Sequence, residues 1–229
     1  MDAEILASAC EQVLPLGSAK LSEGYYYDSL PLCVIDAVFS MGVRYTSVQN
    51  VVSSYCRCFG LREYNQDRGG AAGGHTISDL IKNIEDIGAE ASADTLFHNR
   101  QRTSTRSGIL KSEAVLRFAK VLSKYGVDSF SDFDSAELPP KAEEEIKKIP
   151  GQGSGLCLQY FYMLAGNDNL AKPDRHVLRF IERYTGKKPT VPEAQKLLEK
   201  TVDILKPQYP DLTVRLLDYT IWNYMAHEK

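Results

Sequence analysis

The sequence predicts an all-α protein with about ten helices, and three observations lead to this fold class. Apolar residues recur with the i, i+3, i+4, i+7 spacing of a helix that buries one face. No stretch shows the sustained two-residue alternation of a half-buried strand. Proline and glycine stand where helices begin and end. The clearest apolar stripes run over residues 48–59, 115–122, 157–164, 177–184 and 194–205.

Individual residues predict where these helices start and stop. Pro31 and Pro192 each lie in a first turn, two residues after Ser29 and Thr190. Helix-capping side chains are expected at the N-termini, and glycines in the left-handed conformation at the C-termini. The candidate N-caps are Thr76, Ser92, Ser135 and Asp211, and the candidate C-terminal glycines are Gly126, Gly166 and Gly186.

The composition is that of an ordinary globular protein, with 229 residues, 43% hydrophobic and 25% charged. No apolar run approaches the roughly 20 residues of a membrane helix. The N-terminal residues are acidic and lack the basic region of a signal peptide. We therefore expect a cytoplasmic protein without a membrane partner, associated with the nucleoid if the source is bacterial.

The cysteines and histidines do not have metal-ligand spacing. Five cysteines are scattered along the chain, and none follows position 157. The four histidines form neither a His-Glu-x-x-His motif nor a paired ligand spacing. We expect no zinc, no iron–sulfur cluster and no disulfide framework.

The net charge of −3 argues against nucleic-acid binding, but the charge is unevenly distributed. No acidic residue lies between Asp94 and Glu113. This window is either a solvated basic loop or a contact for a phosphate backbone. A second unusual segment, the glycine-rich stretch 68–75, is interpreted as a surface insertion or a lid. The basic residues of the window are Arg100, Arg102, Arg106 and Lys111.

The segment Ile149-Pro-Gly-Gln-Gly-Ser-Gly-Leu156 predicts a tight hairpin between two helices. Gly151 and Gly153 permit backbone angles that side chains disfavour. The N–H groups at the start of the next helix form an anion site that needs no lysine. The alternative is a plain helix–helix connection. The residues of this predicted phosphate-binding hairpin are Pro150, Gly151, Gln152, Gly153, Ser154 and Gly155.

Asp174 opens another predicted helix, in Lys172-Pro-Asp-Arg-His-Val177. It follows Gly155 by 174 − 155 = 19 residues, about one helix and a short loop, so the chain is long enough to bring it beside the hairpin. Asp is a favoured N-cap, which is the structural interpretation. The functional one is an ionised acid at a helix N-terminus that acts on a deoxyribose carbon.

The hairpin and Asp174 resemble the Pro-Gly-x-Gly…Asp signature of the helix-hairpin-helix DNA glycosylase superfamily, with its endonuclease-III-like fold. Weaker similarity lies in residues 30–40 and 106–114, so the resemblance covers roughly residues 30 to 186. It implies a six-helix barrel, residues 29–168, and a second helical lobe, residues 1–28 with 169–229. The active site would lie in the cleft between the lobes, where a flipped base is held.

The resemblance also implies roles for particular residues. Asp174 corresponds to the family's essential aspartate. The carbonyl groups of Lys147, Ile149 and Gln152 match positions that hold a Na⁺ or K⁺ ion bridging to a phosphate. Met41 or Arg44, at the tip of the first barrel helix, would fill the gap left by the flipped base. The alternative is core packing for Met41 and a phosphate contact or surface role for Arg44. The remaining candidates for contacts with the DNA backbone are Arg100, Arg102, Arg106, Lys111, Arg175 and His176.

The chain departs from the family pattern at one informative position. Gly155 stands where bifunctional members carry a nucleophilic lysine, so hydrolysis without strand cleavage is expected. The sequence thus predicts a monomeric, monofunctional DNA N-glycosylase acting on double-stranded DNA with a lesion or mismatch. A non-catalytic DNA-binding protein of the same fold is the alternative. The tyrosines that serve either as stacking surfaces or as core are Tyr25, Tyr26, Tyr27, Tyr160 and Tyr162.

Overall fold

The computed structural model describes residues 2–65, 74–133 and 138–227, and within them the expected all-α fold is confirmed. The described backbone forms helices and turns, with two isolated β-bridges and no named strand. The predicted cap Ser135 and residues 68–73 of the glycine-rich segment 68–75 lie outside the described residues. None of the described helices combines the length and apolar character that a membrane span requires.

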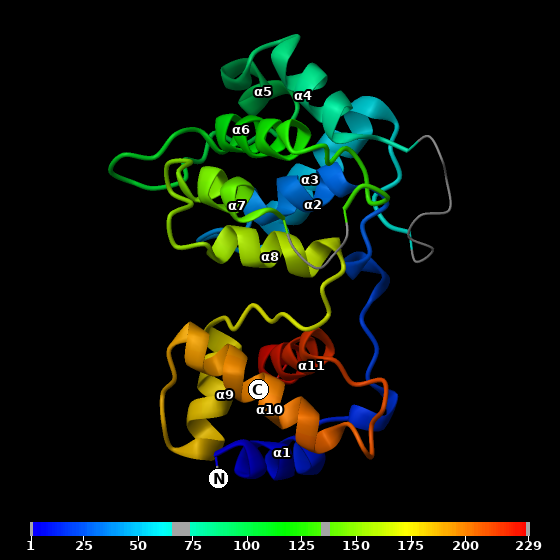
Figure 1. Ribbon diagram of the computed structural model, residues 1–229, viewed down its shortest axis with the longest axis vertical. Coiled ribbons are helices and arrows are strands. Elements are labelled where there is room, and N and C mark those ends of the chain that lie inside the picture. Colours follow the sequence, from blue (N-terminus) through cyan, green and yellow to red (C-terminus); the bar gives the residue numbers. More distant parts are fainter. Residues whose placement is uncertain (1, 66–73, 134–137, 228–229) are drawn as a thin grey trace. The chain divides into compact units, whose positions relative to one another are not determined.

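The chain divides into two compact units (Figure 1). The central unit is Glu23–Gly166, and the terminal unit joins Met1–Ser22 to Asn167–Lys229. The sequence predicted lobe boundaries after residues 28 and 168, and the two units divide after residues 22 and 166.

The central unit is organised around α2 (Leu30–Phe39). All ten residues of α2 are buried, which is typical of a core helix, and its one charged residue, Asp36, accepts a hydrogen bond from the Tyr27 hydroxyl at 2.8 Å. It packs against α3, α6 and α8 and more lightly against α4, while α5 and α7 lie on α6 (Figure 1). The bounds of these helices are Tyr45–Phe59 for α3, Ile77–Glu85 for α4, Ala89–Thr95 for α5, Lys111–Lys124 for α6, Pro140–Lys147 for α7 and Leu156–Ala165 for α8.

Lys111 closes the C-terminal end of α2. Its side chain is buried, and Nζ donates hydrogen bonds to the carbonyl oxygens of Phe39 and Met41, both at 2.9 Å. A cation at this end of a helix also offsets the negative end of the helix dipole. The prediction that Lys111 contacts a DNA backbone is therefore wrong, because its ammonium group lies inside the unit and is already bonded to main-chain carbonyl oxygens.

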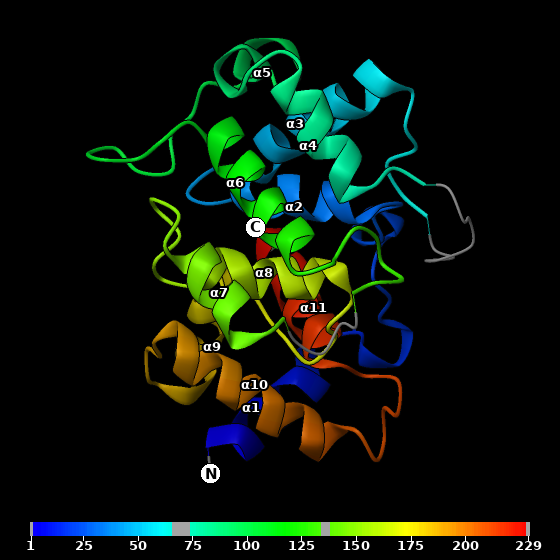
Figure 2. The ribbon, with the colours of Figure 1, turned by 45° about the horizontal axis from the view of Figure 1, so that its top comes forward.

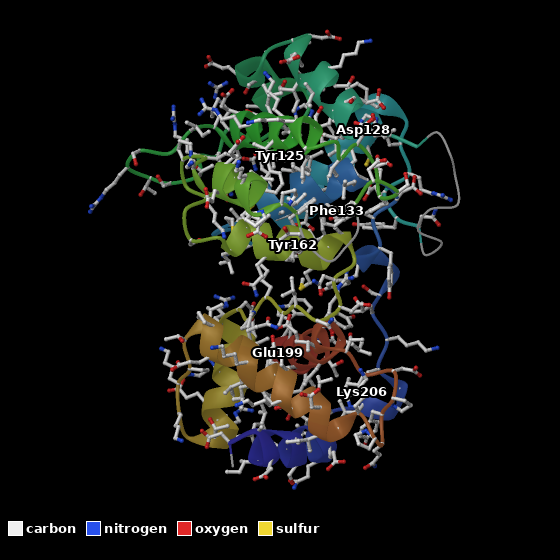
Figure 3. The ribbon with its side chains drawn as sticks, in the orientation of Figure 1. Tyr125, Asp128, Phe133, Tyr162, Glu199 and Lys206 are labelled. Atoms are coloured by element: carbon white, nitrogen blue, oxygen red, sulfur yellow. The ribbon has the colours of Figure 1, made fainter. Side chains whose placement is uncertain are left out.

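An aromatic cluster fills the space between α6, α8 and the segment after α6. The rings of Phe133 and Tyr162 stack with centroids 5.9 Å apart (Figure 3), and Phe161 contacts both. The Tyr162 hydroxyl donates to Glu143 and accepts from the N–H of Leu138. Tyr160 is also buried, so it and Tyr162 belong to the core.

The terminal unit is a small helical cluster of α1 (Asp2–Val13), α9 (Arg175–Thr185), α10 (Val191–Leu205) and α11 (Val214–His227). Helix α1 packs on α9 and α10, and α11 packs on the same two helices. Their apolar faces share one core, in which Leu6, Phe180 and Leu217 are fully buried. The N- and C-terminal segments of the chain therefore fold together.

Most of the predicted helix ends are confirmed. Thr76 and Thr190 form capping boxes with Asp79 and Glu193, while Gly166 and Gly186 cap the ends of α8 and α9. Two predicted caps are wrong. Ser92 lies inside α5, where its hydroxyl donates to the Gly88 carbonyl, and Thr213 rather than Asp211 accepts the N–H of Leu216 in the first turn of α11.

We predict that Lys111→Met lowers the free energy of unfolding by on the order of 3 kcal/mol, because it removes two charge-assisted hydrogen bonds and leaves buried carbonyls unpaired. Chemical denaturation measures this loss. Lys120→Met, on the same helix but half-exposed and paired with Glu85, is the matched control and should change stability little. Equal effects of the two substitutions would contradict the capping role of Lys111.

Candidate functional site

The predicted hairpin connects α7 to α8 through two tight turns. The N–H of Gln152 donates to the Ile149 carbonyl at 2.9 Å, and the N–H of Gly155 donates to the Gln152 carbonyl at 3.0 Å. Gly151 and Gly155 have φ values of 87° and 74°, which strongly favour glycine. Gly153 has no such requirement, so the expectation that its backbone angle needs glycine is wrong, and Gly155 takes that role.

The N-terminus of α8 has only a weak side-chain contact. Its N-cap residue, Gly155, has no side chain, and the Ser154 hydroxyl oxygen accepts the N–H of Leu156 at 3.4 Å. A helix start of this kind carries partial positive charge and favours an anion. The side chain of Lys147 passes close by, since a Cβ built on Gly155 would lie 3.3 Å from Lys147 Cε. Its Nζ lies 3.3 Å from Glu143, so this ammonium group is already paired.

The basic segment between α5 and α6 packs against the hairpin. A Cβ built on Gly151 would lie 2.5 Å from Thr103 Cβ, so only glycine permits this approach. The segment is itself a small hairpin, in which the N–H of Thr103 donates to the Ile109 carbonyl and Arg102 bridges to Leu110. Figures 1 and 2 show residues 96–110, in green, extending away from the helices.

The turn between α2 and α3 joins the same end of the central unit. Lys111 bonds to the Met41 carbonyl in this turn and lies 3.4 Å from Gln101 Oε1 in the basic segment. Three segments, residues 40–44, 96–110 and 148–155, therefore lie together. We call this end of the central unit the loop end.

The loop end carries exposed arginines that differ in how far their charge is already paired within the protein. Arg44, Arg102 and Arg106 are exposed, whereas Met41 is half-buried. Arg102 donates to the Gly108 carbonyl within its own hairpin. Arg100 forms ion pairs with Glu90 and Asp94, which balance its charge and make it a weaker phosphate contact than its neighbours.

The predicted cation position lies in this hairpin as well. The carbonyls of Ile149 and Gln152 each accept a hydrogen bond within the turns. The Lys147 carbonyl oxygen lies near Gly153, because a Cβ built on that glycine would be 3.8 Å from it. The side chain of Gln152 is buried, and its Oε1 atom has no hydrogen-bond partner. Among the described residues, no group of three His, Cys, Asp or Glu side chains is arranged to hold a metal ion.

Asp174 lies in the terminal unit, at the N-terminus of α9. Its Oδ1 atom accepts the N–H groups of His176 at 2.7 Å and Val177 at 3.2 Å, so the predicted N-cap is confirmed. Arg175 is exposed and His176 is half-buried. The Nδ1 atom of His176 is buried and lacks a hydrogen-bond partner. The capping role of Asp174 does not explain why the Nδ1 atom of His176 is buried without a hydrogen-bond partner.

The segment that leads to Asp174 is held by side chains that the sequence analysis missed. Gln195 of α10 donates to the Asn169 carbonyl at 2.9 Å and accepts the N–H of Ala171 at 2.8 Å. The buried Arg215 of α11 donates to Asp168 through its main chain and its guanidinium group. These contacts fix the backbone before α9.

Asp218 of α11 is the second acid of this region and was also missed. It is 7% exposed, its Oδ2 atom accepts the N–H of Lys172 at 3.4 Å, and its Oδ1 atom is buried without a partner. Burial, together with the charge of Asp174 and against the lowering effect of Lys172, raises the pKa of Asp218 to about 7. An acid within the apolar stripe of Val214, Leu217 and Ile221 was the available signal.

The chain belongs to the family described as Domain of unknown function (DUF8548), which matches residues 4–226. A search of curated proteins and a search of solved structures found no match to the chain.

Proposed function

We propose that this protein is a monofunctional DNA N-glycosylase, which hydrolyses the bond between a damaged or mispaired base and its deoxyribose. The observation that carries the proposal is the glycine hairpin at the loop end, which leads into a helix whose N-cap residue is a glycine. The proposed architecture is a barrel lobe containing α2 to α8 and a second lobe containing α1 and α9 to α11. The proposed substrate is double-stranded DNA.

The hairpin supports DNA binding despite the net charge of −3. Main-chain N–H groups and the dipole of α8 attract a phosphate without a formal positive charge. Arg102 and Arg106 lie on the segment that packs against the hairpin, so local positive charge adds to this field. Such contacts position a duplex and carry no base specificity.

Asp174 supplies the proposed chemistry. The target base is flipped out of the duplex. A water oxygen then bonds to C1′ as the C1′–N bond breaks, the bonding electron pair leaves with the base, and the water loses its extra proton to solvent. An ionised Asp174 stabilises the positive charge that develops on the sugar. Its Oδ1 hydrogen bonds to main-chain N–H groups hold the carboxylate in place.

A glycosylase-like protein that binds DNA without catalysis is the second candidate. The observation in its favour is that Asp174 already has a structural task as the cap of α9. A turnover assay on duplexes carrying a panel of lesions and mismatches distinguishes the two, because only the first releases a free base.

We predict that Gly153→Val weakens duplex DNA binding by roughly tenfold, equivalent to about 1.4 kcal/mol. The protein should still fold, because the added Cβ has only the Lys147 carbonyl within 4 Å, at 3.8 Å, while the side chain would hold a phosphate away from the hairpin backbone. Fluorescence anisotropy with a labelled duplex measures the change. Gly17→Val is the control, because a Cβ built on Gly17 would have no atom within 4 Å apart from its chain neighbours. Unchanged affinity of folded Gly153→Val would remove the hairpin from the binding surface.

We predict that excision leaves an intact strand with an abasic site. Gly155 offers no amine for a Schiff base, and its φ of 74° disfavours any side chain there. Borohydride added during turnover should trap no protein–DNA adduct. A trapped adduct would overturn the hydrolytic mechanism, and a Lys172→Gln variant would then test whether the lysine two residues before Asp174 is the nucleophile.

We predict that Asp174→Asn lowers single-turnover excision by several orders of magnitude and leaves duplex affinity unchanged or tighter. Asparagine is an equally good N-cap, so the fold should survive while the charge is lost. Asp211→Asn makes the same change at an exposed position of the terminal unit and should have little effect. Near-normal excision by Asp174→Asn would mean that Asp174 is only a cap.

A further inference from the structure

Asp174 and His176 lie at the start of α9, and Asp218 accepts the N–H of Lys172, two residues before Asp174. The carboxylate of Asp174 contributes to the raised pKa of Asp218, so the two groups interact. Asp218 Oδ1 and His176 Nδ1 are both buried and have no hydrogen-bond partner. Buried polar atoms without partners are rare in folded proteins and often mark a functional site or a bound water.

A purely structural role does not explain an acid at position 218. The hydrogen bond from the N–H of Lys172 needs only a carbonyl-type oxygen, which asparagine also supplies. Aspartate adds a charge that burial disfavours, and it sits beside another acid. A residue that costs stability without an evident structural gain is expected mainly where function requires it.

We infer that Asp218 is a positioning residue of the Asp174 site. Its carboxyl group holds the backbone before Asp174 through Lys172. When ionised, it adds a second negative charge that helps Asp174 stabilise the cationic sugar. This inference rests on the proposed glycosylase function.

The charged groups around Asp218 give the inference a defined pH dependence. Lys172 and Asp174 face it from the segment before α9, Arg215 on its own helix is paired with Asp168, and α10 contributes the uncharged Gln195. Below about pH 7 Asp218 is neutral, and above that pH it is ionised. Excision should therefore rise as pH increases through neutrality.

The test compares Asp218→Asn with the parent protein in single-turnover excision between pH 5.5 and 8.5. At the acidic end the two rates should converge, because protonated aspartate and asparagine are both neutral. Above pH 7 the variant should fall behind by roughly tenfold or more, and its profile should lack the rise. A structural role alone would give parallel profiles, which would overturn the inference.

Two controls isolate the contribution of Asp218. Asp203→Asn removes an exposed charge from α10 and should leave the profile unchanged. Histidine also titrates near neutrality in general, so His176→Gln is measured as well and should retain the rise. Loss of the rise in His176→Gln would assign it to the imidazole and overturn the inference.

Stability provides a second readout that does not depend on activity. The folded-state pKa of Asp218 lies above its ordinary value of 3.8, so the folded state binds the proton more tightly. This acid therefore lowers the free energy of unfolding progressively as pH rises from about 4 to about 7. The stability of Asp218→Asn relative to the parent should increase over that range. A pH-independent difference would contradict the inference, whereas a parent that excises no base at any pH would refute the proposed function and the inference with it.

Discussion

A helix leaves the N–H groups of its first turn and the carbonyls of its last turn without partners, and this constraint shapes both units. The end of α2 is satisfied by Lys111, a buried cation brought from α6. The start of α9 is satisfied by Asp174. The N-cap residue of α8 is Gly155, which has no side chain to offer, and this helix start lies at the end of the unit where three loops meet. That helix start is where the central unit has most reason to bind an anion.

The loop end depends on the same Lys111 contact. By joining the turn after α2 to the start of α6, Lys111 fixes the base of the basic segment, which in turn packs on the hairpin through Thr103 and Gly151. This buried contact therefore positions the exposed residues of the basic segment, although Lys111 itself does not reach the surface. An apparent binding residue in the sequence is here a structural one, and the arginines near it remain the exposed cations.

The sequence predicted what depends on local pattern. Apolar periodicity located α3, α6, α8, α9 and α10, and the turn chemistry located the hairpin, because both are encoded by neighbouring residues. Burial by distant segments was not predictable in this way. Lys111 and Arg102 belong to the same basic window, yet only the packing of α6 on α2 buries the first. Asp218 was missed because an acid in an amphipathic helix is ordinarily assigned to the solvent face.

Gly153 and Asp218 are two positions where the fold does not explain the native residue. The fold makes no visible demand for glycine at Gly153, since its backbone angle and surroundings accept a side chain, so a requirement there would have to come from a ligand. At Asp218 the hydrogen bond from Lys172 needs only a carbonyl-type oxygen and burial disfavours the charge, so a requirement for aspartate would also have to come from chemistry. Gly151 and Lys111 are the contrary cases, in which packing alone explains the residue. Positions where the native residue is not the one that stability would select are therefore the positions where function is most strongly indicated.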